Sequence, residues 1–137
     1  MADLSAGLAV GDVIAERTVH LTRESLVRYA GASGDFNPIH YRDDVAASVG
    51  LPGVLAHGML TMGLASSVVL AALPADVRLV DYGVRFTKPV LVDPESGADV
   101  HVVAKVGVVD ADSARIDLTV KSAETTVLVK AQLRVAL

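Results

Sequence analysis

The second half of the chain alternates apolar and polar residues with a period of two, which is the pattern of β-strands that bury one face. The alternation is clearest in residues 82–86, 100–108, 116–120 and 127–135. In the last of these runs, Val127, Val129 and Ala131 fall on one face, which is predicted to be buried. Short segments rich in Asp, Pro, Gly and Ser separate the runs and predict turns. Together with a shorter run over 12–21, the pattern predicts five antiparallel strands.

Helical signals are concentrated in the first half of the chain. Thr22 is a predicted N-cap, and apolar residues then recur at helical spacing until Gly31 and Gly34, which are predicted to end the helix. Residues 35–40 are expected to form a loop, because the proline within them cannot continue a helix. A short helix is expected over 43–49, with its acidic residues at the positive end of the helix dipole.

A longer helix is predicted in the stretch between Asp44 and Asp76, which contains no formally charged residue. Its unbroken apolar part runs from Gly58 to Leu73, and these 16 residues fall short of the roughly 20 that cross a bilayer. A helix that is apolar on all sides and too short to span a membrane is expected to be buried inside the fold. Helices early and strands late predict an α+β protein, with an antiparallel sheet wrapped around a long central helix.

Composition narrows the functional classes. A length of 137 residues with 52% hydrophobic residues predicts one domain over 1–137, and a net charge of −4 argues against nucleic acid as a partner. The absence of cysteine excludes disulfides and thiolate metal sites. No basic residue precedes Arg17, so a secretory leader and membrane insertion are not expected. We therefore expect a cytoplasmic protein.

The most informative segment for chemistry is Ser33-Gly34-Asp35-Phe36-Asn37-Pro38-Ile39-His40. A spacing of five places Asp35 and His40 on different sides of a helix, so the two side chains converge only if the loop folds back. The glycine and the Asn-Pro pair make such folding reasonable. A carboxylate and an imidazole facing one water could share its deprotonation and the return of a proton. Alternatively, the aspartate caps a loop and the histidine is a satisfied structural group.

A second candidate is Ala56-His57-Gly58-Met59, at the predicted start of the apolar helix. The first N–H groups of a helix lack intrahelical partners, so Gly58 could let a ligand approach the backbone and hold a developing oxyanion. Alternatively, His57 caps the helix and Gly58 relieves crowding. Both interpretations remain open on the sequence alone.

The sequence gives little support for metal binding, nucleotide binding or serine hydrolase chemistry. The four histidines show no HxxxH or HExxH spacing, so no metal site is expected. Neither a GxGxxG nor a GxxxxGK[ST] motif is present, and the serines of the apolar helix are not in a GxSxG elbow. Nucleotide binding and serine hydrolase chemistry are therefore not expected.

Three segments together resemble a known family. They are Tyr29–His40, which contains the octapeptide, Gly50–Met62, which contains the helix start, and Val84–Val90. Their sequences and spacing are similar to those of the MaoC-like, R-specific enoyl-thioester hydratases and dehydratases. Within that family, the chain resembles the B subunits of the (3R)-hydroxyacyl-carrier-protein dehydratase of mycobacterial-type fatty acid synthesis.

The resemblance implies a hot-dog fold and interconversion of trans-2-enoyl and (3R)-3-hydroxyacyl thioesters carried on CoA or acyl carrier protein. It implies that Asp35 and His40 are the catalytic pair, that Asn37 orients the loop or the water, and that the Gly58 N–H polarises the thioester carbonyl. No cofactor or metal is expected. A homodimer, or a heterodimer with another hot-dog subunit, is expected. The alternatives are a hot-dog thioesterase and a non-catalytic acyl-binding or scaffold subunit.

Overall fold

The computed structural model describes residues 7–137. Its elements follow the order β1 (Val13–Leu21), α1 (Arg23–Ser33), the 3₁₀ turn η2 (Pro38–His40), α2 (Asp43–Ser48), α3 (Gly58–Ala71), β2 (Arg78–Phe86), β3 (Ala98–Val109), β4 (Ser113–Ser122) and β5 (Thr125–Ala136).

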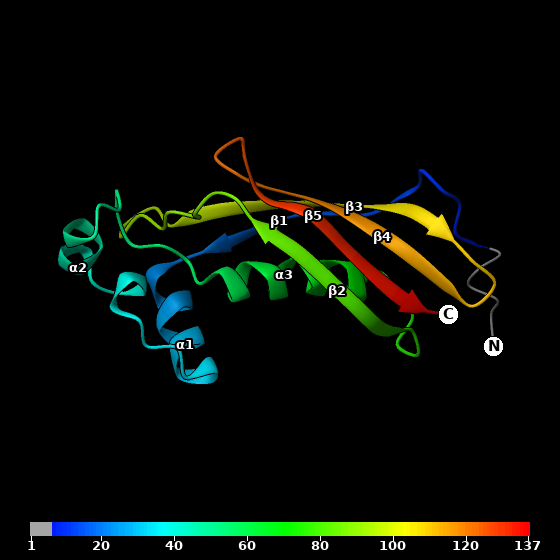
Figure 1. Cartoon of the computed structure of the whole chain (residues 1–137), viewed down its shortest axis with the longest axis horizontal. Helices are drawn as coiled ribbons and strands as arrows, with labels where there is room; N and C mark the ends of the chain where they lie inside the picture. The colour runs from blue at the N-terminus through cyan, green and yellow to red at the C-terminus, as the bar shows by residue number, and fades with distance from the viewer. Residues whose placement is uncertain (1–6) are drawn as a thin grey trace.

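The five strands form one antiparallel sheet in the order β1-β3-β4-β5-β2. Helix α3 runs along one face of the sheet, while α1 and α2 gather at one end, away from the C-terminus (Figure 1). The α+β class and the five antiparallel strands predicted from the sequence are therefore confirmed. β2 is the first strand after α3 but lies at the far edge of the sheet, so β1 and β2 are the two edge strands.

The core lies between α3 and the inner face of the sheet. The alternate residues of β3, from Val100 to Val106, are almost fully buried, and those of β4 continue the same layer. On the helix side, Ala65 and Val69 are completely buried in the same cluster. A small alanine at the middle of the contact lets the helix axis approach the sheet closely.

The sequence predicts that the apolar helix is buried on all sides. In this single chain α3 is buried on one side only, so the prediction is wrong for the chain by itself. Its buried residues are Thr61, Ala65, Val68 and Val69. Met59, Gly63, Ser67 and Ala71, which are spaced four residues apart, form an exposed stripe along the helix. The reason is geometric, because a single five-stranded sheet covers only one side of a helix. Within residues 7–137, no helix is long and apolar enough to cross a membrane.

The strict alternation predicted for the last strand also fails at one point. Val127 and Leu128 are both buried although they are neighbours, and Val129 is only partly buried. Lys130 adopts φ 49° within the strand, and the pairing registers of β5 with both β2 and β4 shift nearby. A β-bulge of this kind inserts a residue and exchanges the faces of the strand on either side.

Helix α1 begins after the predicted N-cap, Thr22. Of its two predicted ends, Gly31 and Gly34, only the second ends the helix. The Thr22 hydroxyl accepts the N–H of Ser25, and the Ser25 hydroxyl accepts the N–H of Thr22, which completes a capping box. Gly31 lies inside the helix. Gly34 ends it, in the left-handed conformation at φ 75°, which favours glycine.

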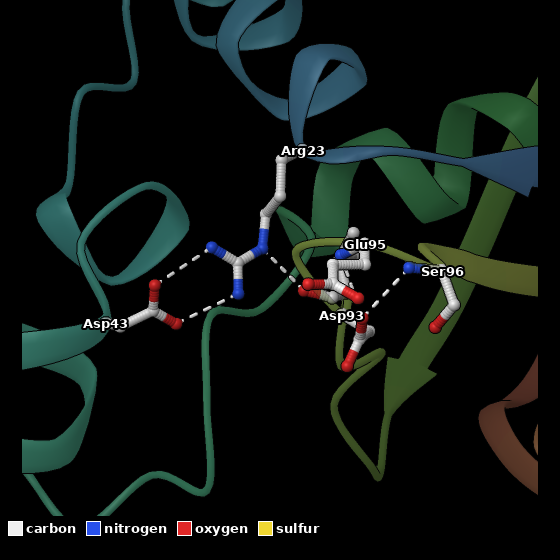
Figure 2. Close-up of polar contacts among 6 residues, drawn as sticks. Arg23, Asp43, Asp93, Glu95 and Ser96 are labelled. Carbon is white, nitrogen blue, oxygen red and sulfur yellow. Dashed lines mark hydrogen bonds and ion pairs between the residues drawn. The ribbon is translucent and has the colours of Figure 1, made fainter.

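An arginine at the start of α1 fastens three segments together (Figure 2). The Arg23 guanidinium donates two hydrogen bonds to the Asp43 carboxylate of α2, at 3.1 and 2.9 Å. Its Nε donates to the backbone carbonyl of buried Val92. The Asp93 carboxylate accepts the N–H groups of Glu95 and Ser96, which closes the turn beyond it. The first turns of α1 and α2 are thereby fixed to the segment that leads into β3.

We predict that Arg23→Ala lowers the free energy of unfolding by about 1–3 kcal/mol, because the buried Val92 carbonyl loses its hydrogen-bond donor. Urea denaturation followed by circular dichroism measures the change. The matched control is Arg28→Ala, which removes only an exposed ion pair with Glu24 on the same helix. Equal losses in the two variants would contradict the role assigned to Arg23.

Candidate active site

The loop after α1 folds back through side chains that bond to its own backbone. The Asp35 carboxylate accepts the N–H of Asn37 at 3.1 Å, and the Asn37 side-chain oxygen accepts the N–H of Ile39 at 3.3 Å. Residues Pro38–His40 then form a single 3₁₀ turn instead of an irregular loop, with the proline at the first position, where its missing N–H does no harm. The Asn37 side chain thus shapes the loop.

His40 is held by the backbone of Leu55. The His40 ring nitrogen Nδ1 lies 2.7 Å from the Leu55 carbonyl oxygen, and the Leu55 N–H donates to the Ile39 carbonyl at 3.2 Å. A carbonyl can only accept, so Nδ1 carries the hydrogen. In the neutral ring, Nε2 therefore presents a lone pair, and a histidine in this state can take a proton.

The segment that holds His40 is itself paired with the chain beyond β2. The Ala56 N–H donates to the Val90 carbonyl at 2.8 Å, and the Val92 N–H donates to the Val54 carbonyl at 3.0 Å. This short antiparallel pairing, which includes the bridge between Leu55 and Leu91, continues to the turn that Arg23 anchors. The carbonyl that accepts the His40 Nδ1–H is thus fixed by backbone hydrogen bonds.

His57 completes a cluster that spacing did not predict. Its Nε2 donates to the Asp35 backbone carbonyl at 3.1 Å, and its ring stacks on His40 with centroids 3.8 Å apart and planes at 21°. The side chain makes no capping hydrogen bond to α3, so the capping interpretation was wrong. One ligand-type atom from each of Asp35, His40 and His57 lies within 4.8 Å of the others. The loop therefore does bring Asp35 and His40 together.

The cluster has the composition of a metal site but lacks its geometry. An imidazole binds a metal ion through a lone pair in the plane of its ring. Because the two rings lie face to face, their lone pairs run in separate, nearly parallel planes, and one ion cannot lie in both. The stacked arrangement suits proton transfer at one ring better than shared coordination.

A pocket of about 290 Å³ opens beside His40. It lies between the start of α3, the end of β2 and the start of β5, and its lining residues are mostly apolar: His40, Leu55, Ala56, Gly58, Thr61, Phe86, Thr87, Lys88, Pro89, Val90, Val127 and Leu128. Asp35 is not among the lining residues, and its side chain is exposed to solvent. Of the two side chains, His40 therefore lines the pocket and Asp35 does not.

Gly58 lines the pocket as the first residue of α3. A β-carbon at this position would lie 2.9 Å from the Phe86 ring, so the glycine does relieve crowding, as one of the two interpretations predicted. As the first helical residue, its N–H has no intrahelical acceptor. The helix dipole favours negative charge at the same point. The geometry is therefore compatible with both roles considered for Gly58.

The charge state of His57 follows from its surroundings. Burial lowers the pKa of His57, and the neighbouring His40 lowers it further, while its hydrogen bond to the Asp35 carbonyl acts in the opposite direction. His57 is therefore neutral near pH 7. With Nε2 donating, its Nδ1 is an acceptor, and this buried atom has no hydrogen-bond partner among the described residues.

The chain is similar in sequence to curated proteins of known activity class. The chain is 40% identical over 79 residues to the 3-hydroxyacyl-thioester dehydratase X of Mycobacterium tuberculosis, a match that covers 58% of this chain and 27% of the relative. It is 31% identical over 87 residues to the (R)-specific enoyl-CoA hydratase of Rhodospirillum rubrum, covering 63% and 60%. The chain thus spans less than two thirds of the length of these curated relatives.

Solved structures extend the likeness to nearly the whole chain. The R-hydratase PhaJ1 of Pseudomonas aeruginosa superposes with a TM-score of 0.82 at 29% identity, covering 96% of this chain and 83% of that one. The ChsH1-ChsH2 complex and the truncated HadBC complex, both from Mycobacterium tuberculosis, superpose at TM-scores of 0.84 and 0.72. At 18% identity each, these two show the hot-dog fold alone, and the closer likeness to B subunits stays a prediction.

The family profile described as MaoC like domain matches residues 8–127. This range includes the loop of Asp35 and His40, the start of α3 and all of β2, and it stops at residue 127, near the start of β5. The chain therefore belongs to the MaoC-like domain family.

Proposed function

We propose that the chain is an R-specific hydro-lyase that interconverts trans-2-enoyl and (3R)-3-hydroxyacyl thioesters in fatty acid metabolism. The observation that carries the proposal is His40, whose Nε2 is left with a lone pair at the wall of an apolar pocket, with Asp35 beside it. The names of the relatives, a 3-hydroxyacyl-thioester dehydratase and an (R)-specific enoyl-CoA hydratase, support the same reaction class.

The pair would act on one water molecule. As the water oxygen forms a bond to C3 of the enoyl thioester, the His40–Asp35 pair takes a proton from that water. The pair returns a proton to C2, so that the net change is the addition of water across the double bond. The Leu55 carbonyl, which accepts the Nδ1–H, stabilises the positive charge that His40 carries between the two transfers. Dehydration follows the same path in reverse.

Negative charge develops on the thioester oxygen as the enolate forms. The Gly58 N–H lies at the start of a 14-residue helix and beside the pocket, where an unpaired donor and the helix dipole can stabilise that charge. Loss of one such donor typically slows a reaction by about 100- to 1000-fold. Gly58 would therefore contribute through its backbone, and Asn37 through the shape of the loop.

The pocket favours an acyl chain as the substrate group. Its walls between Phe86 and Val90 and at Val127 and Leu128 are largely apolar, and Lys88 adds a cationic side chain to the lining. An acyl chain would occupy the apolar part, and the thioester would lie near Gly58. The carrier would be CoA or acyl carrier protein.

A second hot-dog subunit is the partner that the exposed surface favours. The edge strand β2 carries exposed Leu79, Val80 and Phe86, and α3 adds exposed Met59 from its uncovered stripe. Unpaired edges and contiguous apolar surface are typical of interfaces. Two of the solved structures that share the fold are complexes of two named chains. We therefore propose a homodimer or a heterodimer of hot-dog subunits that buries β2 and α3.

We predict that Asp35→Asn and His40→Gln each reduce hydration of crotonyl-CoA, or of a longer enoyl thioester, by at least about 100-fold, because each removes one of the two proton-transfer groups. Loss of the enoyl absorbance measures the rate, and circular dichroism checks the fold. The matched control is His101→Gln, since His101 lies outside the pocket, on β3. Full activity in either site variant would refute the mechanism, and release of free thiol would indicate a thioesterase.

We predict that Val80→Lys weakens the association between subunits, because it places a charge on the exposed edge strand β2. Multi-angle light scattering is expected to give the wild-type protein, alone or with its partner chain, a mass of about twice 14.2 kDa. The control is Val13→Lys, which adds the same charge at an equally exposed valine of the other edge strand, β1. A fully active monomer would contradict the proposed interface, and activity only with a second chain would establish the heterodimer.

A further inference from the structure

His57 is a buried histidine to which the proposed reaction assigns no proton transfer. Its side chain is 1% exposed, although it stands at the N-cap position of α3, where side chains usually reach the helix backbone. It makes no such bond, and its Nδ1 is buried without a partner among the described residues. An unpaired buried acceptor is unfavourable for folding. A phenylalanine would avoid that penalty but would give up the hydrogen bond from the ring to the Asp35 carbonyl, so the histidine provides a contact that an apolar ring cannot.

The contacts of the ring point to both members of the catalytic pair. One face of His57 stacks on His40 at 3.8 Å, and Tyr29 of α1 meets the ring edge-on at 4.7 Å. Among residues 7–137, the ring's one hydrogen bond goes to the backbone carbonyl of Asp35. A single side chain at the start of α3 therefore touches the imidazole of one proton-transfer residue and the backbone of the other.

The titratable groups around His57 are Tyr29 from α1, Asp35 from the loop and His40 from η2. Donation from Nε2 to the Asp35 carbonyl fixes one tautomer of His57. In this neutral state, the ring places no second positive charge against His40 when His40 takes up a proton. The flat ring of His57 also covers one face of the His40 ring.

We propose that His57 is a positioning residue, which holds the His40 ring by stacking and the Asp35 segment by its Nε2–H, so that both groups face the same water. The inference rests on the proposed function. Its two contacts are separable by substitution. His57→Gln keeps an N–H donor for the Asp35 carbonyl and removes the ring, whereas His57→Phe keeps the flat ring and removes the donor.

Each variant is expected to lower kcat by about 10- to 100-fold, since small displacements of catalytic groups have effects of that size. KM is expected to change little, because His57 does not line the pocket. His101→Gln serves as the control for replacing a histidine. Variants whose kcat per folded molecule equals that of the wild type would overturn the proposal and leave His57 a purely structural residue.

A second measurement does not depend on activity. ¹⁵N NMR of the wild-type protein with its partner, if it has one, is expected to show His57 neutral at pH 7, with the proton on Nε2. In the His57→Gln variant the His40 ring signals are expected to shift and broaden, because the ring loses its stacked neighbour, whereas His57→Phe keeps a stacked ring and is expected to change them less. A protonated His57 or the opposite tautomer at pH 7 would overturn the proposal. If the wild type hydrates no enoyl thioester, the proposed function fails, while the NMR result still decides whether His57 positions His40.

The pH dependence of stability gives a third test. The pKa of His57 is lower in the folded state than in the unfolded chain, so the unfolded chain binds more protons as the pH falls below about 6.5. The free energy of unfolding is therefore expected to fall with pH in that range. His57→Phe is expected to flatten the decline, and an unchanged slope would show that His57 is not held neutral by the fold.

Discussion

The hydrogen bond from His40 Nδ1 to the Leu55 carbonyl is the interaction on which the site depends. It determines which ring nitrogen carries the hydrogen, and therefore which one has the lone pair in a residue that lines the pocket. Leu55 is fixed in turn, because its N–H bonds to Ile39 and its neighbours pair with the segment around Leu91. A backbone carbonyl cannot titrate or rotate away as a side chain can. The chemistry of His40 is thus determined by the path of the main chain.

The fold supplies the rest of the site through one helix. Because α3 is apolar and packs against the sheet, its first turn lies beside the pocket, where no side-chain cap covers Gly58. The same helix places His57 under His40. A developing negative charge on a thioester oxygen and a transient positive charge on His40 would therefore be met by fixed groups at one helix start, in a pocket with few polar walls. The exposed stripe of α3 shows that this arrangement uses only one side of the helix.

Local signals in the sequence were sufficient for most of the elements. The cap at Thr22, the glycine stop at Gly34 and the alternation of β3 and β4 each depend on neighbouring residues, and they predicted the observed structure. The convergence of Asp35 and His40 could be stated only as a condition, since it depends on Leu55 from another segment. The stacking of His57, the bulge at Lys130 and the exposed side of α3 depend on tertiary packing, and the sequence pattern did not predict them.

The central claim is that His40 and Asp35 act on one oxygen atom while the Gly58 N–H faces the thioester. A crystal structure of the protein, with its partner if it has one, bound to a (3R)-3-hydroxyacyl thioester tests this most directly. The account predicts that the 3-hydroxyl group lies within hydrogen-bond distance of His40 Nε2 and of the Asp35 carboxylate, with the thioester oxygen at the Gly58 N–H. A ligand bound with its hydroxyl turned away from His40, or outside the pocket between α3 and β2, would contradict it.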